Sequence, residues 1–329
     1  MPDIAAFSPL VSAAVTILLI VWMLKVSDRL PLDVPNDRSL HTRPMPRSGG
    51  IAIMAGVAAG FAILQTPLVI VLPVALLVAV SHLDDLRGLP IFARFGAQLV
   101  AALWFAFGAL AAVPLPLLVC IVFGILWVTN LYNFMDGSDG LAGGMTVIGF
   151  AFLGAGAWMS RDDALLIECA IVAAAGAAFL LFNFPPARIF MGDAGSVPVG
   201  FLAVALSLAG WRDGDFPFWF PAVVFAPFVA DATLTLLKRM LAREPFWRAH
   251  NKHYYQRLVR MGWSHRGLAL AEYALMLVCG ATGIWALPRP VYLQSAAVLA
   301  LVVVFGALAL RVDAAWRRHQ KNQVERAQA

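Results

Sequence analysis

The 329-residue chain is too hydrophobic for a soluble protein. Apolar residues make up 61% and charged residues 13%, about half the charged share of a typical soluble domain. The three cysteines all lie in apolar segments, which excludes a disulfide framework and a cysteine-rich zinc site. The net charge of +5 fits contact with anionic lipid head groups and phosphorylated substrates, and we expect no nucleic-acid partner.

Apolar segments of about 17–22 residues recur along the chain, each long enough to cross a hydrocarbon core of about 30 Å. The sequence therefore predicts an all-α polytopic membrane protein, a single integral membrane domain over residues 1–329. The first segment has no basic residue before it and no cleavage site after it, so we expect a retained span there. Ten or eleven spans are expected, at about 5–26, 49–65, 67–82, 91–111, 113–129, 143–160, 163–182, 195–211, 216–236, 267–287 and 290–310.

The distribution of basic residues predicts the orientation of these spans. With eleven spans, all Lys and Arg residues except Arg161, Arg212 and Arg289 fall on one side. Cytoplasmic loops are the ones enriched in Lys and Arg. We therefore expect the N-terminus outside, the C-terminus in the cytoplasm, and a location in the inner (plasma) membrane. The informative polar sequence lies on the cytoplasmic side, in segments 27–50, 81–90, 129–144, 183–196 and 238–266.

Adjacent carboxylates occur at the end of the third predicted span. Asp84 and Asp85 repel each other beside the membrane, so together they favour a hard divalent cation such as Mg²⁺. The alternative is a solvated helix end with Arg87 as a local partner.

A second polar group follows the fifth predicted span. Asn130, Asn133 and Asp136 are three residues apart, which would place them on one helix face. Two carboxamides and a carboxylate suit a phosphate, sugar or metal site. Asp139 follows in a glycine-rich segment, which by itself is also typical of a turn.

Asp193 precedes the eighth predicted span within the sequence Gly192-Asp193-Ala-Gly195-Ser196. A glycine turn could present its carboxylate to a metal ion. An acidic residue at this position could equally be a helix cap.

Two basic segments complete the candidate site. The loop after the ninth predicted span carries His250, Lys252, His253 and Arg257, a set that favours a pyrophosphate site over a zinc site. A plain basic surface loop is the alternative. The first polar loop contains a cationic group that could hold the lipid phosphate or the nucleotide: Arg38, His41, Arg43 and Arg47.

Taken in order, these segments resemble the polyprenyl-phosphate N-acetylhexosamine-1-phosphate transferases of glycosyltransferase family 4. The resemblance covers about residues 28–270 and rests on four pieces: the Asp84-Asp85 pair, the Asn130-to-Asp139 block, Phe190-Met-Gly-Asp193-x-Gly-Ser, and the histidine loop. That loop reads His-Asn-Lys-His, whereas the peptidoglycan branch carries a run of histidines. The sequence is therefore more similar to the enzymes that start O-antigen, common-antigen or related lipopolysaccharide and cell-wall polysaccharide synthesis.

The resemblance implies a transferase that moves a sugar-1-phosphate from a UDP-N-acetylhexosamine to undecaprenyl phosphate and releases UMP. It implies Mg²⁺, with Mn²⁺ as an alternative, held by Asp193 and Asp136, and catalytic roles for Asp84, Asp85 and Asp136. Substrate binding would fall to Asn130, Asn133, Asp139, Arg47, His250, Lys252, His253 and Arg257. A homodimer is compatible with this interpretation. The alternatives are transfer of phospho-N-acetylmuramoyl-pentapeptide and, outside enzymes, transport of a lipid-linked sugar.

Overall fold

Helices form almost all of the regular structure in the computed structural model, which describes residues 3–27, 30–33, 35, 40, 44–245 and 250–328. Arg38, His41 and Arg43 lie outside the described residues. The elements are η1 (Asp3–Phe7), α1 (Ser8–Lys25), β1 (Leu32–Asp33), β2 (Met45–Pro46), α2 (Gly49–Leu64), α3 (Leu68–Arg87), α4 (Ile91–Ala109), α5 (Leu115–Phe134), α6 (Leu141–Ser160), α7 (Asp163–Asn183), α8 (Asp193–Asp213), α9 (Trp219–Val224), α10 (Ala226–Leu241), α11 (Tyr254–Arg260), α12 (His265–Ala286) and α13 (Val291–Gln328).

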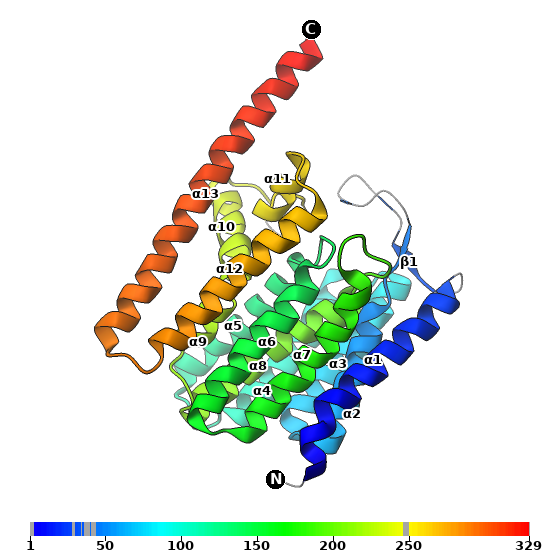
Figure 1. The fold of residues 1–329 in the computed structure, drawn as a ribbon, viewed down its shortest axis with the longest axis vertical. Coiled ribbons are helices and arrows are strands. Elements are labelled where there is room, and N and C mark those ends of the chain that lie inside the picture. The colour runs from blue at the N-terminus through cyan, green and yellow to red at the C-terminus, as the bar shows by residue number, and fades with distance from the viewer. Residues whose placement is uncertain are drawn as a thin grey trace.

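Each predicted span corresponds to a helix or, in one case, to a pair of helices. Within the described part of the chain, nine helices are long and apolar enough to cross a membrane, and α2 is a shorter apolar helix. The helices satisfy their backbone groups internally, as a hydrocarbon environment requires. The two ends of the chain lie at opposite ends of the bundle (Figure 1), which fits eleven crossings if α9 and α10 are counted together.

The prediction of one continuous span over 216–236 is wrong. Phe225 ends α9 and also precedes α10, and Pro227 follows in the first turn of α10. Proline has no backbone N–H and its ring clashes with the preceding turn of a continuous helix. The chain therefore changes direction at Phe225 and continues as α10.

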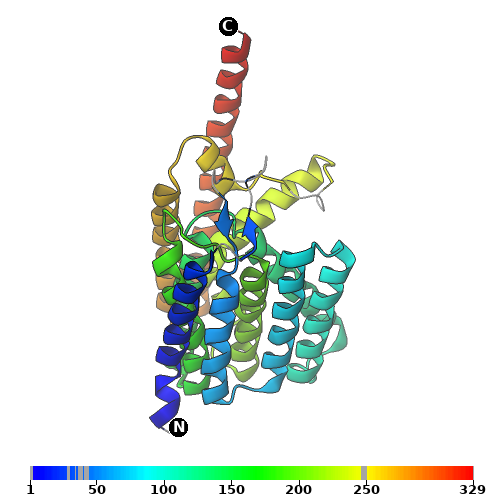
Figure 2. The ribbon, with the colours of Figure 1, turned by 90° about the vertical axis from the view of Figure 1, so that its right-hand side faces the viewer.

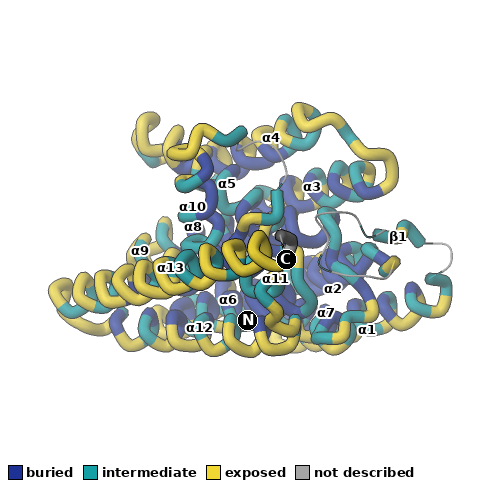
Figure 3. Tube along the Cα trace, turned by 90° about the horizontal axis from the view of Figure 1, so that it is seen from above, coloured by how far each residue is buried: buried dark blue, intermediate teal, exposed yellow. Residues whose placement is uncertain are grey.

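Helix α8 is the centre of the bundle. Nearly all of its residues from Ala194 to Gly210 are buried, and it contacts α2, α3, α5, α6 and α7. Seen from above, exposed positions lie on outer helices such as α1 and α12 and along α13, which runs across the view (Figure 3). An element surrounded by other helices holds its first residue, Asp193, in a fixed place.

A short hairpin precedes α2, and an extended segment precedes α8. Backbone hydrogen bonds join the two. Strand β1 pairs with β2 in antiparallel register, and both lie above the ends of the helices (Figure 2). Gly49 N and Gly50 N then donate to the carbonyl oxygens of Phe190 and Met191, at 2.9 and 2.8 Å. These bonds align the entry into α2 with the segment that leads into Asp193.

Two glycines let α2 and α8 approach each other at this polar end. A Cβ atom added at Gly50 would lie 2.2 Å from the backbone nitrogen of Gly195. Backbone atoms cannot move away cheaply, so a side chain at this position would separate the two helices.

Helix α13 extends beyond the rest of the bundle (Figure 1). Its Asp313 binds Arg257 of α11 at 2.9 Å and also pairs with Lys238 of α10. The ring of Trp316 faces the guanidinium of Arg260, 5.0 Å from the ring centroid. These contacts anchor α13 to α10 and α11 where it leaves the apolar part of the bundle.

We predict that Gly50→Ala lowers the stability of the protein by about 1–3 kcal/mol, the usual cost of overpacking. The matched control is Gly124→Ala in α5, where an added Cβ has no neighbour within 4 Å. Alanine favours a helix over glycine by about 0.5–1 kcal/mol, so this control should be neutral or slightly stabilising. Thermal unfolding of the purified variants in one detergent measures the difference. Equal unfolding midpoints for the two variants would show that a side chain at position 50 can be accommodated beside Gly195.

Candidate active site

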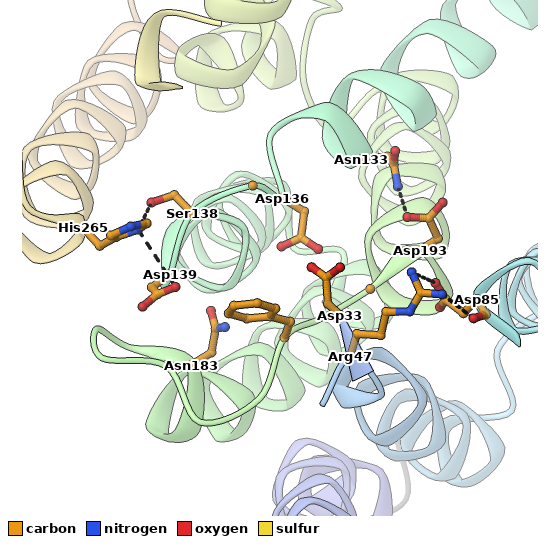
Figure 4. Close-up of a pocket in the computed structure, with 13 residues that line it drawn as sticks. Asp33, Arg47, Asp85, Asn133, Asp136, Ser138, Asp139, Asn183, Asp193 and His265 are labelled. Atoms are coloured by element: carbon orange, nitrogen blue, oxygen red, sulfur yellow. Dashed lines mark hydrogen bonds and ion pairs between the residues drawn. The ribbon is translucent and has the colours of Figure 1, made fainter. Parts of the chain in front are cut away.

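A polar pocket of about 150 Å³ lies at the end of the bundle where α3 and α5 end and α8 begins. Its lining comes from residues far apart in the sequence: Asp33, Arg47, Asp85, Asn133, Asp136, Gly137, Ser138, Asp139, Asn183, Phe190, Gly192, Asp193 and His265. Figure 4 shows Asp33 and Asp136 near the middle, Asp85 and Asp193 on one side, and Asp139 with His265 on the other. We refer to it as the acidic pocket, because five carboxylates line it.

Asp193 is the first residue of α8 and follows Gly192, whose φ is +71°. Glycine adopts this left-handed backbone conformation without strain. Asn133 donates from Nδ2 to Asp193 Oδ1 at 3.0 Å and to Ser196 Oγ at 2.9 Å. The helix N-terminus also favours a negative charge here. Asp193 is thus held by its own helix and by α5, with its second oxygen 3.7 Å from Arg94 Nη1.

The structure separates Asp84 from Asp85, which corrects the expectation that they share one cation. The buried Asp85 faces the acidic pocket, where its Oδ2 accepts from Ala194 N at 3.2 Å. Arg47 lies 3.7 Å from Asp85 Oδ1 and donates to the Asp85 backbone oxygen. Consecutive residues of a helix point about 100° apart. The two carboxylates therefore meet different partners.

Asp84 faces a second, smaller pocket. It accepts from Leu89 N at 2.6 Å and from Arg94 Nη1 at 2.9 Å. Arg94, from α4, is thus its cationic partner, where the sequence indicated Arg87. Arg94 therefore neutralises the charge of Asp84, and Asp84 and Asp85 have separate partners.

Asp136 is not on the helix face that it was expected to share with Asn130 and Asn133. Helix α5 ends at Phe134, and the chain turns through Met135 into the pocket. Desolvation by the surrounding protein, together with repulsion from Asp193 and Asp85, raises the pKa of Asp136 well above its usual value. A positive charge brought into the pocket would relieve this repulsion.

Asn130 lies outside the acidic pocket. It donates to Gln98 Oε1 at 2.6 Å and lines the second pocket, of about 110 Å³, with Asp84 and Arg94. That pocket shares Asn133 and Asp193 with the acidic pocket and has an apolar side formed by Leu77, Val80, Ile91, Phe95, Ala97 and Val197. The two pockets therefore meet at Asn133 and Asp193, one polar and the other half apolar.

The far side of the acidic pocket is formed by the turn between α5 and α6 and by α12. Asp139 Oδ2 accepts from Ala187 N at 3.0 Å. Asn183 accepts from Gly140 N and donates to Ile189 O, both at 2.9 Å. Both ends of the Asn183 amide are thereby used in shaping the loops, so its role is structural.

The histidine loop lies beside the acidic pocket without lining it. Asp231 accepts from Tyr254 N and Tyr255 N at 2.9 Å and lies 3.2 Å from His253 Nδ1. His253 is buried and caps the N-terminus of α11. The loop reaches the site through Tyr255, whose hydroxyl donates to Phe134 O at 3.0 Å.

The other basic residues of this loop have partners within the chain. Lys252 binds Glu244 at 2.7 Å and Arg257 binds Asp313 at 2.9 Å. Burial and the neighbouring His253, Arg239 and Lys252 lower the pKa of His250 to about 4. His250 is therefore neutral near pH 7, so at an anion site it would act as a hydrogen-bond donor and not as a charge.

Two ionisable residues of the acidic pocket had not been identified from the sequence. Asp33 is one of three acids in the basic loop 27–50, and His265 is a single histidine at a predicted span end. The hairpin brings Asp33 to Asp136, and the start of α12 brings His265 to Ser138 and Asp139 (Figure 4). Neither residue belongs to a recognisable local pattern, so only the fold reveals them.

No preformed metal cage exists among the described residues, since they contain no group of three or more His, Cys, Asp or Glu side chains placed to hold an ion. A Mg²⁺ ion, however, usually takes one or two carboxylates and completes its shell with water and substrate phosphates. Asp193 and Asp136, with the Asn133 amide alongside, supply hard oxygen ligands of this kind. The donor set fits such an ion without a closed cage.

Comparisons with known proteins match the central part of the chain to one family. Residues 67–210 match the model of glycosyl transferase family 4, a range that contains Asp84, Asp85, Asp136 and Asp193. A probable undecaprenyl-phosphate N-acetylglucosaminyl 1-phosphate transferase of Bacillus subtilis is 29% identical over 303 residues, covering 84% of this chain and 83% of the relative.

Two further relatives come from other bacterial groups. A decaprenyl-phosphate N-acetylglucosaminephosphotransferase of Mycobacterium tuberculosis is 29% identical, with 84% of this chain and 80% of the relative covered. The undecaprenyl-phosphate alpha-N-acetylglucosaminyl 1-phosphate transferase of Escherichia coli is 26% identical, with 76% and 75% covered. The chain is therefore similar to glycosyl transferase family 4 over residues 67–210, and to relatives whose names describe transfer of N-acetylglucosamine 1-phosphate to a polyprenyl phosphate.

Proposed function

We propose that the protein transfers an N-acetylhexosamine-1-phosphate from a UDP-sugar to undecaprenyl phosphate and releases UMP. The observation that carries this proposal is the junction of the two pockets at Asn133 and Asp193. A polar pocket suits a nucleotide diphosphate, and a half-apolar pocket suits a phosphate attached to a hydrocarbon chain. The names of the relatives support both substrates.

In this proposal Mg²⁺, or Mn²⁺ in its place, is held by Asp193 and Asp136. A bound divalent ion would neutralise charge on the diphosphate and on the departing UMP. The raised pKa of Asp136 supports the choice, because burial and the neighbouring carboxylates destabilise its charged form, which a bound cation would stabilise. Asn133 would orient Asp193 through the bond to Oδ1.

The protein's own residues would position the reactants. An oxygen of the lipid phosphate attacks the sugar-linked phosphorus, the bond from that phosphorus to the bridging oxygen breaks, and this oxygen leaves with UMP. Arg47 lies at the edge of the acidic pocket, where its guanidinium can bind phosphate oxygens. Positioning and charge neutralisation supply most of the rate enhancement in such transfers.

We assign Asp85 and Asp136 to the donor side, and Asp84 and Asn130 to the acceptor side, from the pockets that they line. Asp139 would bind the donor at the far end of the acidic pocket. The histidine loop would contribute to substrate binding only at the margin of the acidic pocket, because Lys252 and Arg257 are already paired with Glu244 and Asp313.

The physiological product that we propose starts an O-antigen or related surface polysaccharide. The histidine loop supports this branch, since it lacks the run of histidines found in the muramoyl-pentapeptide enzymes. The excess of Lys and Arg at the pocket end supports a cytoplasmic active site in the inner membrane. A transporter would place its binding site near the bilayer midplane, whereas this site lies at the helix ends.

The direct test is an assay of UMP release by the purified protein with undecaprenyl phosphate, Mg²⁺ and a panel of UDP-sugars. We expect lipid-dependent UMP release with a UDP-N-acetylhexosamine and little with UDP-N-acetylmuramoyl-pentapeptide. Preference for the pentapeptide donor would assign the protein to the peptidoglycan reaction. No lipid-dependent release from any donor would refute the proposed activity.

Asp193→Asn should reduce turnover at least about a hundredfold, because the site would lose a charged ligand for the ion. Asp213→Asn is the matched control at the opposite end of the same helix, where Asp213 pairs with Arg212. The control should keep its activity, and both variants should be recovered from the membrane in equal amounts. Equal activity of the two variants would remove Asp193 from the metal site.

Asn133→Ala should weaken the apparent affinity for Mg²⁺ about 10–100-fold, the usual effect of losing a residue that orients a ligand. Asn130→Ala, one helical turn earlier, leaves the Asn133–Asp193 bond intact and should keep the wild-type dependence on Mg²⁺. Titration of activity with Mg²⁺ at saturating substrates measures both. If only Asn130→Ala changed the dependence of activity on Mg²⁺, the ion would belong in the second pocket.

A further inference from the structure

His265 is a residue of the acidic pocket with no role in the mechanism above. It lies in the first turn of α12, and part of its side chain is open to the pocket. Its Nδ1 is 2.8 Å from Ser138 Oγ and 4.0 Å from Asp139 Oδ1. Its Nε2 is 3.3 Å from the Leu40 carbonyl oxygen. One imidazole ring thus touches the first polar loop and the turn that carries Asp136 and Asp139.

The partners of the neutral ring determine where its hydrogen lies. A carbonyl oxygen can only accept, so the contact with Leu40 requires the hydrogen on Nε2. Nδ1 then has a lone pair and accepts from the Ser138 hydroxyl. The Ser138 hydroxyl hydrogen is thereby fixed, and the lone pairs of its oxygen are left for the pocket.

Besides the bond from Ala187 N to Asp139, three ring-bearing side chains hold the turn from Asp136 to Asp139 at its two ends and in its middle. Tyr255 OH donates to Phe134 O before the turn, at 3.0 Å, and Tyr273 OH donates to Gly140 O after it, at 2.6 Å. Both tyrosines hold the ends of the turn, and neither lines the acidic pocket. His265 holds the middle, at Ser138, and does so from inside the pocket.

We propose that His265 is a positioning residue for the sugar-nucleotide donor. By accepting the Ser138 hydrogen bond it holds Ser138 and the adjoining Asp139, and thus places the open carboxylate oxygen of Asp139 against the donor. This inference rests on the proposed function, since it assigns the far end of the acidic pocket to the donor. It does not require His265 to touch the reacting phosphorus.

The test compares steady-state kinetics of purified variants with both substrates varied. His265→Ala should raise KM for the UDP-sugar about fivefold to tenfold, the scale of one lost hydrogen bond. The kcat and the KM for the lipid should stay within about twofold. His319→Ala, in the exposed tail of α13 beside Trp316, is the matched control and should match the wild type.

Two amide variants separate the two hydrogen bonds of the ring. The oxygen of Asn can take the place of Nδ1 and accept from Ser138, whereas Gln reaches further and can donate to Leu40 O. We therefore expect His265→Asn to restore KM and His265→Gln to resemble His265→Ala. The opposite pattern would overturn the role of Ser138.

A double-mutant cycle completes the test. If His265 acts through Ser138, then Ser138→Ala should raise KM as much as His265→Ala does, and the double variant should add little to either. Additive effects would overturn the proposal, as would a loss of thermal stability without a change in KM. A wild-type protein that is inactive with every donor would instead refute the proposed function, which separates the two failures.

Discussion

The close approach of Gly50 and Gly195 is the constraint on which the site depends. Without side chains at these positions, the entry into α2 and the first turn of α8 pack backbone to backbone. The amides of Gly49 and Gly50 can then bond the carbonyl oxygens of Phe190 and Met191. That pairing fixes the segment leading into Asp193, and Asn133 and Arg94 approach the carboxylate from α5 and α4.

This arrangement also explains how so many carboxylates can gather at the end of an apolar bundle. Asp84 and Asp85 are each matched by an arginine from another element, and Asp139 is held by a backbone amide. Asp136 is crowded by the other acids, and this is reflected in its raised pKa. The carboxylates are therefore accommodated mainly by partners within the protein.

The order of the spans and the convergence of Asp85, Asn133, Asp136 and Asp193 could be predicted from the sequence. Hydropathy locates helices in a membrane protein because every spanning segment must satisfy its own backbone, and the polar segments at one end have only one surface to share. The break at Phe225 was also readable, since Pro221 and Pro227 lie within the predicted span.

What could not be predicted depends on how each helix is rotated against its neighbours. The separation of Asp84 from Asp85, and of Asn130 from the acidic pocket, follows from the packing of α3 and α5 against α4 and α8. The pairing of Arg257 with Asp313 joins residues 56 positions apart, a distance over which sequence spacing carries no information. Asp33 and His265 are single residues brought into the pocket by a hairpin and by a helix start.

Helix α13 has a consequence for how the protein can be connected to other molecules. Its 38 residues correspond to about 57 Å, whereas a hydrocarbon core is about 30 Å thick. The surplus, anchored at its base through Asp313, is a stiff spacer and not a flexible tail. A module fused to the C-terminus would be held about 25 Å beyond the bundle.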